Sequence, residues 1–195
     1  MQDFHTEESR PMAPDAGSPS VSVVIPGKNE AENLPELIEE IRVALGARAF
    51  EIIVVDDGSD DGTDRAILAL MAERPWLRLV RHALSCGQSA AVRTGLLAAR
   101  APIVVTIDGD GQNDPAFMPA LIDALEAGGP MMGIAAGQRL KRTDSGAKRI
   151  ASRVANKVRG AILQDGTRDS GCGLKALRRE MFLLFPYFDG WHRYL

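Results

Sequence analysis

The sequence predicts an α/β fold, in which a mostly parallel, Rossmann-like sheet carries helices on both faces. Short apolar runs of the kind that form buried strands alternate with segments whose apolar residues recur at helical spacing. The connections are short, and loops rich in Asp and Gly directly follow several of the runs. This repeated strand–helix–strand order is typical of a parallel sheet with helices on its two sides.

The predicted strands are short apolar runs bounded by turn residues. In chain order they are Val21–Pro26, Phe50–Val55, Trp76–Arg81, Ile103–Ile107 and Met132–Ala136. An uninterrupted run such as Ile103–Ile107 indicates a strand that is buried on both faces.

Each predicted helix follows one of these strands and is expected to cover the sheet. In chain order the helices are Asn33–Leu45, Asp61–Glu73, Gly87–Arg100 and Pro115–Glu126. In the first helix, apolar residues separated by three and four positions share one face, namely Leu34, Leu37, Ile38, Ile41 and Leu45.

Composition excludes several classes of protein. The 195 residues are 45% apolar, enough for a substantial core, and the net charge of -3 gives no reason to expect nucleic-acid binding. Cys86 and Cys172 are far apart, which argues against a disulfide framework, and the three scattered histidines predict no zinc site. With no signal peptide and no apolar run of membrane-spanning length, we expect a cytoplasmic protein.

Asp108-Gly109-Asp110 follows the predicted strand Ile103–Ile107. Ligands of open α/β sheets bind beyond the carboxyl ends of the strands. In an extended segment the side chains of residues two apart point the same way, so both carboxylates could face one ligand. Such a pair suits Mg²⁺ or Mn²⁺ and, through the metal, a diphosphate. The alternative is a solvated turn, since Asp and Gly are common turn formers.

Two further polar loops follow the first two strands. In the loop after Phe50–Val55, Asp57 is expected to accept hydrogen bonds from a base or ribose. A calcium loop of the EF-hand type is rejected there, because its twelfth position falls on Leu68 and not on a bidentate Glu. After Val21–Pro26, Asn29 and Glu30 could hold a nucleoside, or could simply form a turn and helix cap.

The combination of motifs resembles the family-two glycosyltransferases with the GT-A fold, and most of all their polyprenyl-phosphate branch, the dolichol-phosphate mannose synthase-like enzymes. The resemblance runs from about Val21 to Leu195. It is carried by V-V-I-P-G-K-N-E, V-V-D-D-G-S-D-D-G-T, D-G-D-G-Q-N-D-P, G-Q-R and D-S-G-C-G-L-K in this order. It implies a glycosyltransferase domain over residues 20–195, which we expect to be incomplete at its C-terminal end. Residues 1–19 are polar, contain three prolines and show no periodicity, so we expect a flexible tail there.

The resemblance also implies site residues. Asp108 and Asp110 would hold the metal, Asp110 with a catalytic role, and Arg139 and Asp169 would act near the phosphates and the acceptor. The expected nucleotide and substrate contacts are Pro26, Asn29, Glu30, Asp57, Gly87, Ser89, Asp108 and Gln112. For Asp169, the alternative is a turn residue.

The implied reaction is metal-dependent, inverting transfer of a sugar from a UDP- or GDP-linked donor to a dolichyl or undecaprenyl phosphate. The alternatives are a catalytically impaired fragment that binds nucleotides and a transferase with a soluble sugar acceptor. The basic segment 139–159 has apolar residues at helical spacing. It could lie on the inner face of a membrane or form a solvated helix packed on the sheet, and it lacks the aromatic residues expected for nucleic-acid binding.

Overall fold

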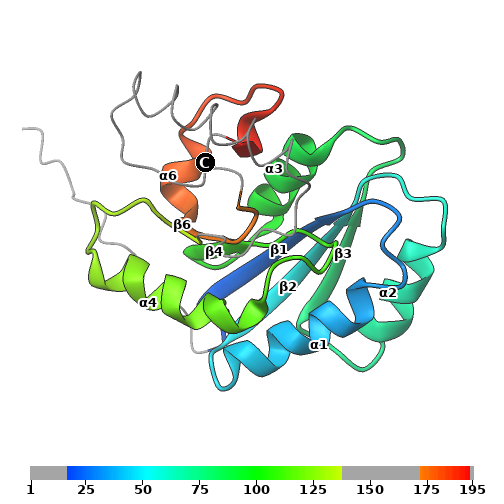
Figure 1. Cartoon of the computed structure of the whole chain (residues 1–195), viewed down its shortest axis with the longest axis horizontal. Helices are drawn as coiled ribbons and strands as arrows, with labels where there is room; N and C mark the ends of the chain where they lie inside the picture. The colour runs from blue at the N-terminus through cyan, green and yellow to red at the C-terminus, as the bar shows by residue number, and fades with distance from the viewer. Residues whose placement is uncertain (1–16, 138–171, 194–195) are drawn as a thin grey trace, which may run out of the picture.

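The computed structural model describes residues 17–137 and 172–193 and has a six-stranded sheet at its centre (Figure 1). The spatial order is β3-β2-β1-β4-β6-β5. The strands are β1 (Val21–Gly27), β2 (Phe50–Asp56), β3 (Leu77–Arg81), β4 (Ile103–Thr106), β5 (Ile134–Ala136) and β6 (Lys175–Arg178). Strands β1 to β4 pair in parallel, and β6 is antiparallel to both of its neighbours. The predicted mostly parallel α/β fold is confirmed.

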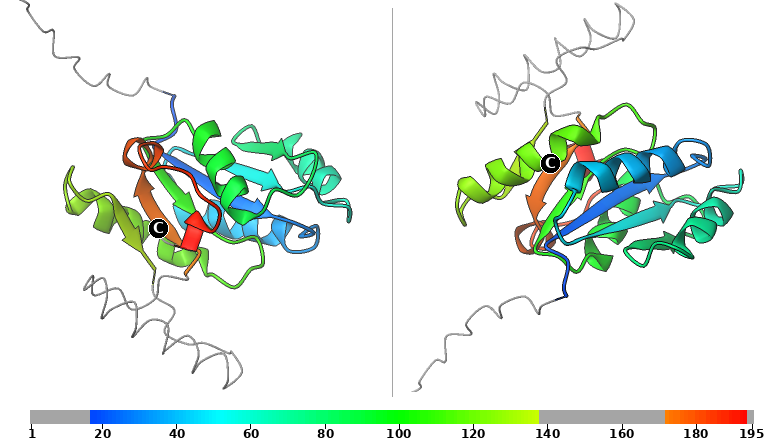
Figure 2. Two further views of the ribbon diagram at one scale, coloured as in Figure 1. Left: turned by 90° about the horizontal axis from the view of Figure 1, so that it is seen from above. Right: turned by 90° about the horizontal axis from the view of Figure 1, so that it is seen from below.

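Helices cover both faces of the sheet. Seen from below, α1 and α4 lie in front of the sheet, and seen from above α3 does (Figure 2). The helical segments are α1 (Leu34–Leu45), α2 (Thr63–Met71), α3 (Gln88–Ala98), η1 (Pro115–Phe117), α4 (Met118–Ala127), α6 (Arg179–Leu183) and η2 (Trp191–Arg193). The predicted helices are confirmed with ends shifted by a few residues, and the last of them is divided into η1 and α4.

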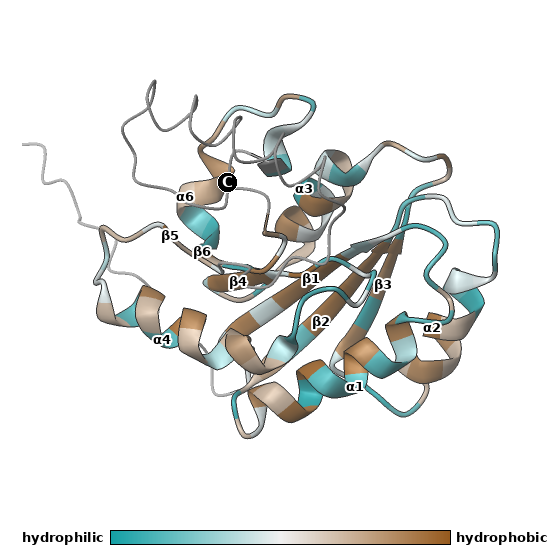
Figure 3. Cartoon of the chain, in the orientation of Figure 1, coloured by the Kyte–Doolittle hydropathy of each residue, from teal (hydrophilic) through white to brown (hydrophobic). Residues whose placement is uncertain are grey.

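Alternation along the strands builds two apolar layers. Val23 and Ile25 of β1 pack into the layer of α1 and α4, whereas Val24 packs into the opposite layer with α3. Both faces of β1 and β2 are therefore buried, which explains their uninterrupted apolar sequences and the brown strands of Figure 3.

Glu51 is an ionisable residue within the buried strand β2, with 1% of its surface exposed. The hydroxyl of Ser22, its partner on β1, donates to Glu51 Oε1 at 2.7 Å. Arg78 and Arg100 donate to Oε2 at 2.7 and 2.9 Å. Burial raises the pKa of Glu51, but these hydrogen bonds outweigh burial, so the pKa lies below its ordinary value.

The register of the sheet brings the functional loops to one edge. Gly27 at the end of β1 lies beside Asp56, and Val24 lies beside Thr106 at the end of β4. Because β6 runs the other way, its first residue, Lys175, also lies at this edge, beside Thr106. The loops after β1, β2, β3 and β4 therefore leave the sheet together.

Two predicted segments lie partly or wholly beyond the described part of the chain. The tail over residues 1–19 is described only from residue 17, and the basic segment 139–159 falls outside altogether. Within the described ranges, none of the helices has the length and apolar character needed to cross a bilayer.

Strand β6 was not predicted, because its sequence K-A-L-R is short and has a cation at each end.

Replacement of Glu51 by Ala is expected to lower the free energy of unfolding by about 3 kcal/mol, because it removes the buried acceptor of the Ser22 hydroxyl, the Arg78 guanidinium and the Arg100 N–H. Urea unfolding followed by circular dichroism measures the change. Glu39→Ala is the matched control, since Glu39 pairs with Arg42 on the exposed face of α1 and its loss should change stability little. Equal effects of the two substitutions would contradict the role assigned to Glu51.

Candidate functional site

The loop after β1 is fastened to the loop after β2. The backbone N–H of Asn29 donates to Ser59 Oγ at 2.9 Å, and the Asn29 side-chain oxygen accepts from the N–H of Asp60 at 3.1 Å. The N–H of Glu30 donates to Thr63 Oγ1 at 3.1 Å. Asn29 has a φ of 59°, which suits Asn better than most residues. Asn29 and Glu30 therefore shape this edge of the sheet, and their contact with a nucleotide stays a prediction.

The carboxylate of Asp57 accepts four hydrogen bonds. Its Oδ1 accepts from a His82 ring nitrogen at 2.7 Å and from the N–H of Cys86 at 2.8 Å. Its Oδ2 accepts from the Ser85 hydroxyl and from the N–H of Gly87, both at 2.8 Å. Because a carboxylate offers about four acceptor positions, Asp57 is saturated by the loop that joins β3 to α3.

These four hydrogen bonds stabilise the ionised form of Asp57. Burial raises the pKa of the carboxyl, but the hydrogen bonds outweigh it and lower the pKa from 3.8 to about 2. Because an ionised carboxylate can only accept, the nitrogen that faces it, His82 Nδ1, carries the ring proton. The other ring nitrogen, Nε2, lies 2.9 Å from Thr94 Oγ1 and accepts from this hydroxyl.

Gly58 allows the two loops to meet closely. Its φ is 72°, and a Cβ placed on it would lie 2.8 Å from the backbone nitrogen of Ser85. A larger residue at this position would push the 82–87 loop away from Asp57. The Gly of the D-D-G-S motif is thus required by backbone contact as well as by its conformation.

Asp108 and Asp110 lie in the loop after β4. Strand β4 ends at Thr106, and Gly109-Asp110 forms a turn. The prediction that Asp108 and Asp110 lie in an extended segment, with both side chains on one side, was therefore wrong. Gln88 Nε2 donates to Asp108 Oδ1 at 2.7 Å. Asp108 is half-buried, Asp110 is exposed, and Asp110 Oδ1 accepts from the N–H of Gln112 at 3.1 Å.

The surroundings of Asp108 and Asp110 fit a hard divalent cation. A Cβ on Gly173 would lie 2.1 Å from Asp108 Oδ2, so this glycine leaves the space that the carboxylate occupies. A Cβ on Gly109 would lie 3.3 Å from the Pro26 carbonyl oxygen. The glycine therefore lets the loop pack closely on the end of β1. The available donors are oxygen atoms, the ligands that Mg²⁺ and Mn²⁺ prefer.

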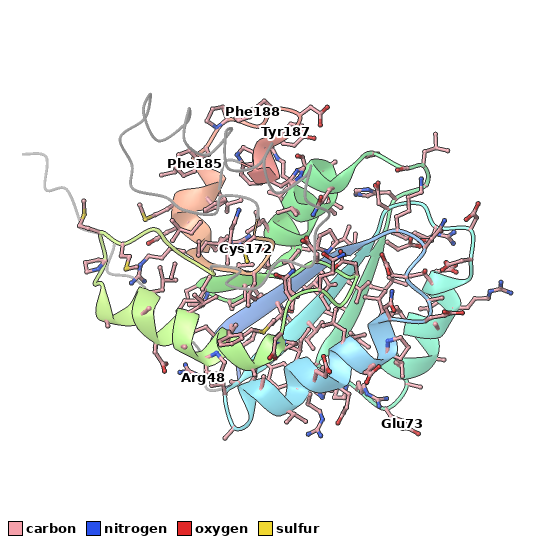
Figure 4. All side chains as sticks on the ribbon, in the orientation of Figure 1. Arg48, Glu73, Cys172, Phe185, Tyr187 and Phe188 are labelled. Atoms are coloured by element: carbon pink, nitrogen blue, oxygen red, sulfur yellow. The ribbon has the colours of Figure 1, made fainter. Side chains whose placement is uncertain are left out.

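The C-terminal segment closes over the start of α3. Ser89 is buried, and its hydroxyl lies 2.6 Å from His192 Nδ1. Lys175 Nζ donates to the carbonyl oxygen of His192 at 3.3 Å. The chain reaches this point through the loop between α6 and η2, which carries Phe185 and Tyr187 (Figure 4). Ser89 thus contacts this segment, and its predicted contact with the nucleotide remains untested.

The structure brings most of the predicted site residues to one edge, but not all of them are described. Pro26 lies near the end of β1, and the others follow β1, β2, β3 and β4, namely Asn29, Glu30, Asp57, Gly87, Ser89, Asp108, Asp110 and Gln112. Arg139 and Asp169 lie outside the described residues. Sequence reasoning missed His82, although it directly follows the parallel strand β3 and the same rule could have found it. It also missed the contact of His192, for which the sequence carries no signal.

Comparison of the sequence with known families and proteins gives matches over most of the chain. The family described as Glycosyl transferase family 2 matches residues 22–184. An undecaprenyl-phosphate 4-deoxy-4-formamido-L-arabinose transferase from Pseudomonas aeruginosa is 39% identical over 83% of this chain and 48% of the relative. A protein of the same name from Erwinia tasmaniensis is 37% identical over 83% of this chain and 50% of the relative. The chain spans about half the length of the curated relatives it matches.

Solved structures share the architecture. One is glucosyl-3-phosphoglycerate synthase from Mycobacterium tuberculosis, in complex with Mn²⁺, UDP-glucose and phosphoglyceric acid. It superposes with a TM-score of 0.68 and is 26% identical, over 87% of this chain and 60% of that one. A mannosyltransferase from Pyrobaculum calidifontis, in complex with GDP-mannose and Mn²⁺, gives 0.61 and 24% identity, over 89% and 48%. The predicted GT-A fold is confirmed.

Asp57→Asn is expected to lower the free energy of unfolding at pH 7 by about 2 kcal/mol or more, because the amide group would face donors that now bind a carboxylate. Since folding lowers the pKa of Asp57, its contribution is complete above the ordinary pKa of 3.8 and is lost as the pH falls toward about 2. The difference between variant and parent in urea unfolding should therefore shrink between pH 5 and pH 2. Asp60→Asn, an equal charge change on an exposed neighbour, should show no such trend.

Proposed function

Because the chain belongs to glycosyl transferase family 2, we propose that it transfers a sugar from a UDP- or GDP-linked donor to a polyprenyl phosphate. The observation that carries the proposal is the identity of 37 to 39% to undecaprenyl-phosphate sugar transferases across 83% of the chain. The described residues of the site support it, because polar loops from four parallel strands meet at the edge where such sheets bind ligands. Since the chain spans about half of these relatives, the complete activity is part of the proposal.

The donor nucleotide would lie along the loops after β1, β2 and β3. Pro26 lies at the end of β1, Asn29 and Glu30 lie in the loop that follows it, and Asp57 anchors the loop after β3. Gly87 precedes α3 and Ser89 lies in its first turn, where backbone N–H groups without a partner inside the helix and the helix dipole favour the negative charge of a phosphate. This arrangement supports the assignment of these residues to nucleotide binding.

The divalent metal would be held by Asp108 and Asp110, with Gln112 beside them. When bound there, Mg²⁺ or Mn²⁺ would offset the negative charge that develops on the departing nucleoside diphosphate. Gln88 holds one oxygen of Asp108, which fixes the direction of the carboxylate before any ligand arrives. We assign Asp110 the greater catalytic role, because its side chain is exposed and can change its orientation when the metal and the donor diphosphate bind.

A phosphate acceptor needs little help to become a nucleophile. Its second pKa is about 6, so at pH 7 most of it is already a dianion. A phosphate oxygen forms the bond to C1 of the sugar while the bond from C1 to the diphosphate oxygen breaks, and C1 is inverted. The charge leaves with the nucleoside diphosphate. Arg139 would contact the phosphates, and Asp169 would position the acceptor instead of removing a proton.

The identity of the sugar acceptor decides where in the cell the domain would act, and a soluble acceptor is an alternative to the lipid. A lipid acceptor would place the domain on the cytoplasmic face of a membrane, with the basic segment 139–159 as the contact. A soluble acceptor is the second candidate, because the synthase from Mycobacterium tuberculosis is in complex with phosphoglyceric acid. A domain that binds nucleotides without transferring sugar is the third.

Titration calorimetry with UDP and GDP tests the donor site. Mn²⁺ is expected to increase the affinity for the preferred nucleotide at least 10-fold, which is about 1.4 kcal/mol, and Asp108→Ala or Asp110→Ala should abolish that gain. Asp114→Asn is the matched control, because Asp114 is an exposed acid of the same loop whose side chain accepts from the N–H of Ala116. A gain from Mn²⁺ that survives both alanine substitutions would rule out the assigned metal ligands.

Product formation from UDP- and GDP-linked sugars tests the acceptor. Mass spectrometry should detect glycosyl phosphate with a short-chain polyprenyl phosphate and no product with the polyprenol of the same length, which lacks the nucleophile. The rate should fall as the pH drops below about 6, because the acceptor phosphate becomes protonated. Product on phosphoglyceric acid or a free sugar alone would favour the soluble acceptor, and nucleotide binding without any product would favour the binding domain.

A further inference from the structure

We propose that Asp57, His82 and Cys86 form a binding site for Zn²⁺, separate from the carboxylates of the loop after β4. One carboxylate oxygen, one ring nitrogen and the thiol sulfur of these residues lie within 4.8 Å of one another. The three residues follow β2 and β3 and precede α3, so the sheet and the helix fix their positions independently. The sequence predicted no zinc site, because the three histidines are scattered and Asp57 is distant from His82 and Cys86 along the chain.

His82 is already oriented as a metal ligand would be. A histidine that binds zinc through one nitrogen usually makes a hydrogen bond with the other. Here Nδ1 faces Asp57 and Nε2 faces the Thr94 hydroxyl at 2.9 Å. When zinc binds Nδ1, the ring proton moves to Nε2 and is donated to Thr94 Oγ1, so this contact remains and no proton leaves the ring.

Zinc would take the place of the proton that now lies between His82 and Asp57. The two atoms are 2.7 Å apart, and ligands of one tetrahedral zinc ion are separated by roughly 3.3 to 3.6 Å. The required increase is roughly 0.6 to 0.9 Å at this pair, and the thiol has to approach the other two ligands by about 1 Å. Asp57 stays in place during the change, because the N–H groups of Cys86 and Gly87 continue to hold its two oxygens.

Burial and charge suit a cation that enters from solvent. Asp57 is buried, His82 is half-buried and Cys86 is exposed, so a path leads from water to the buried ligand. The thiol now donates to the carbonyl oxygen of Leu84 at 3.3 Å, a weak hydrogen bond that is lost at little cost. On binding, the Cys86 proton is released to water. One thiolate and one carboxylate then neutralise Zn²⁺, and water completes a fourth position.

The ligand types separate this site from the proposed catalytic metal. Sulfur and imidazole select Zn²⁺ over Mg²⁺ and Mn²⁺, whereas Asp108 and Asp110 offer only oxygen. A zinc ion bound there would link Asp57, at the end of β2, to the 82–87 loop through metal–ligand bonds in addition to the present hydrogen bonds. Zinc should therefore stiffen the loop that precedes α3, whether or not the chain binds a nucleotide.

Titration of the metal-free, reduced chain with Co²⁺ tests the proposal directly, because a thiolate bound to Co²⁺ gives an intense near-ultraviolet charge-transfer band. One Co²⁺ per chain should produce the band, and Zn²⁺ should remove it. Cys86→Ser should abolish the band and weaken Zn²⁺ binding, measured by competition with a chromophoric chelator, more than 100-fold. Loss of the outer partner in Thr94→Val should weaken it about 10- to 100-fold.

The matched controls separate the two metal sites. Cys172, the other cysteine, is buried in the core, so the band should not depend on it (Figure 4). Asp110→Asn should leave the Co²⁺ band unchanged, and Cys86→Ser should leave the effect of Mn²⁺ on nucleotide binding unchanged. Absence of the band in the parent chain, or a band that survives Cys86→Ser, would overturn the zinc site without bearing on the proposed transferase activity.

Discussion

Two carboxylates, Glu51 in β2 and Asp57 directly after it, hold the two ends of the connection that carries α3. At the end of the strand, Asp57 accepts from the backbone N–H groups of Cys86 and Gly87, just before the helix begins. Near its start, Glu51 accepts from the N–H of Arg100, just after the helix ends. Between them, Gly95 lets the helix pack directly on β1, since a Cβ there would lie 2.2 Å from Val24 Cγ1. The position of α3, and with it Gln88 and Ser89, depends on these contacts.

The fixed position of α3 matters because the helix joins the two halves of the site. Its first residue, Gln88, binds Asp108 of the proposed metal loop, and its second, Ser89, contacts His192 of the C-terminal segment. The loop that precedes it is bound to Asp57 on the proposed nucleotide side. A displacement of α3 would therefore change the metal loop, the nucleotide side and the C-terminal segment together. Glu51 and Asp57 are therefore buried acids that stabilise the fold and, through α3, also hold the residues of the site in place.

The sequence was sufficient for the parts of the fold that depend on local pattern. Apolar runs and helical spacing located β1 to β4 and α1 to α4, and the carboxyl ends of parallel strands then located Asp57 and Asp108. It failed where a feature depends on distant partners. Strand β6 is K-A-L-R and is a strand only because β4 and β5 lie on either side of it. The pairing of Ser89 with His192 joins residues 103 positions apart and leaves no periodic trace.

The saturation of Asp57 restricts how it can serve a nucleotide. A base that donates a hydrogen bond to this carboxylate has to replace one of its present donors. The N–H groups of Cys86 and Gly87 are fixed by the start of α3, and His82 is held from its other side by Thr94. The Ser85 hydroxyl is exposed and can turn to water at little cost. A base would therefore replace Ser85 at Oδ2, whereas zinc would replace the proton at Oδ1, so the two ligands would approach opposite oxygens of one carboxylate.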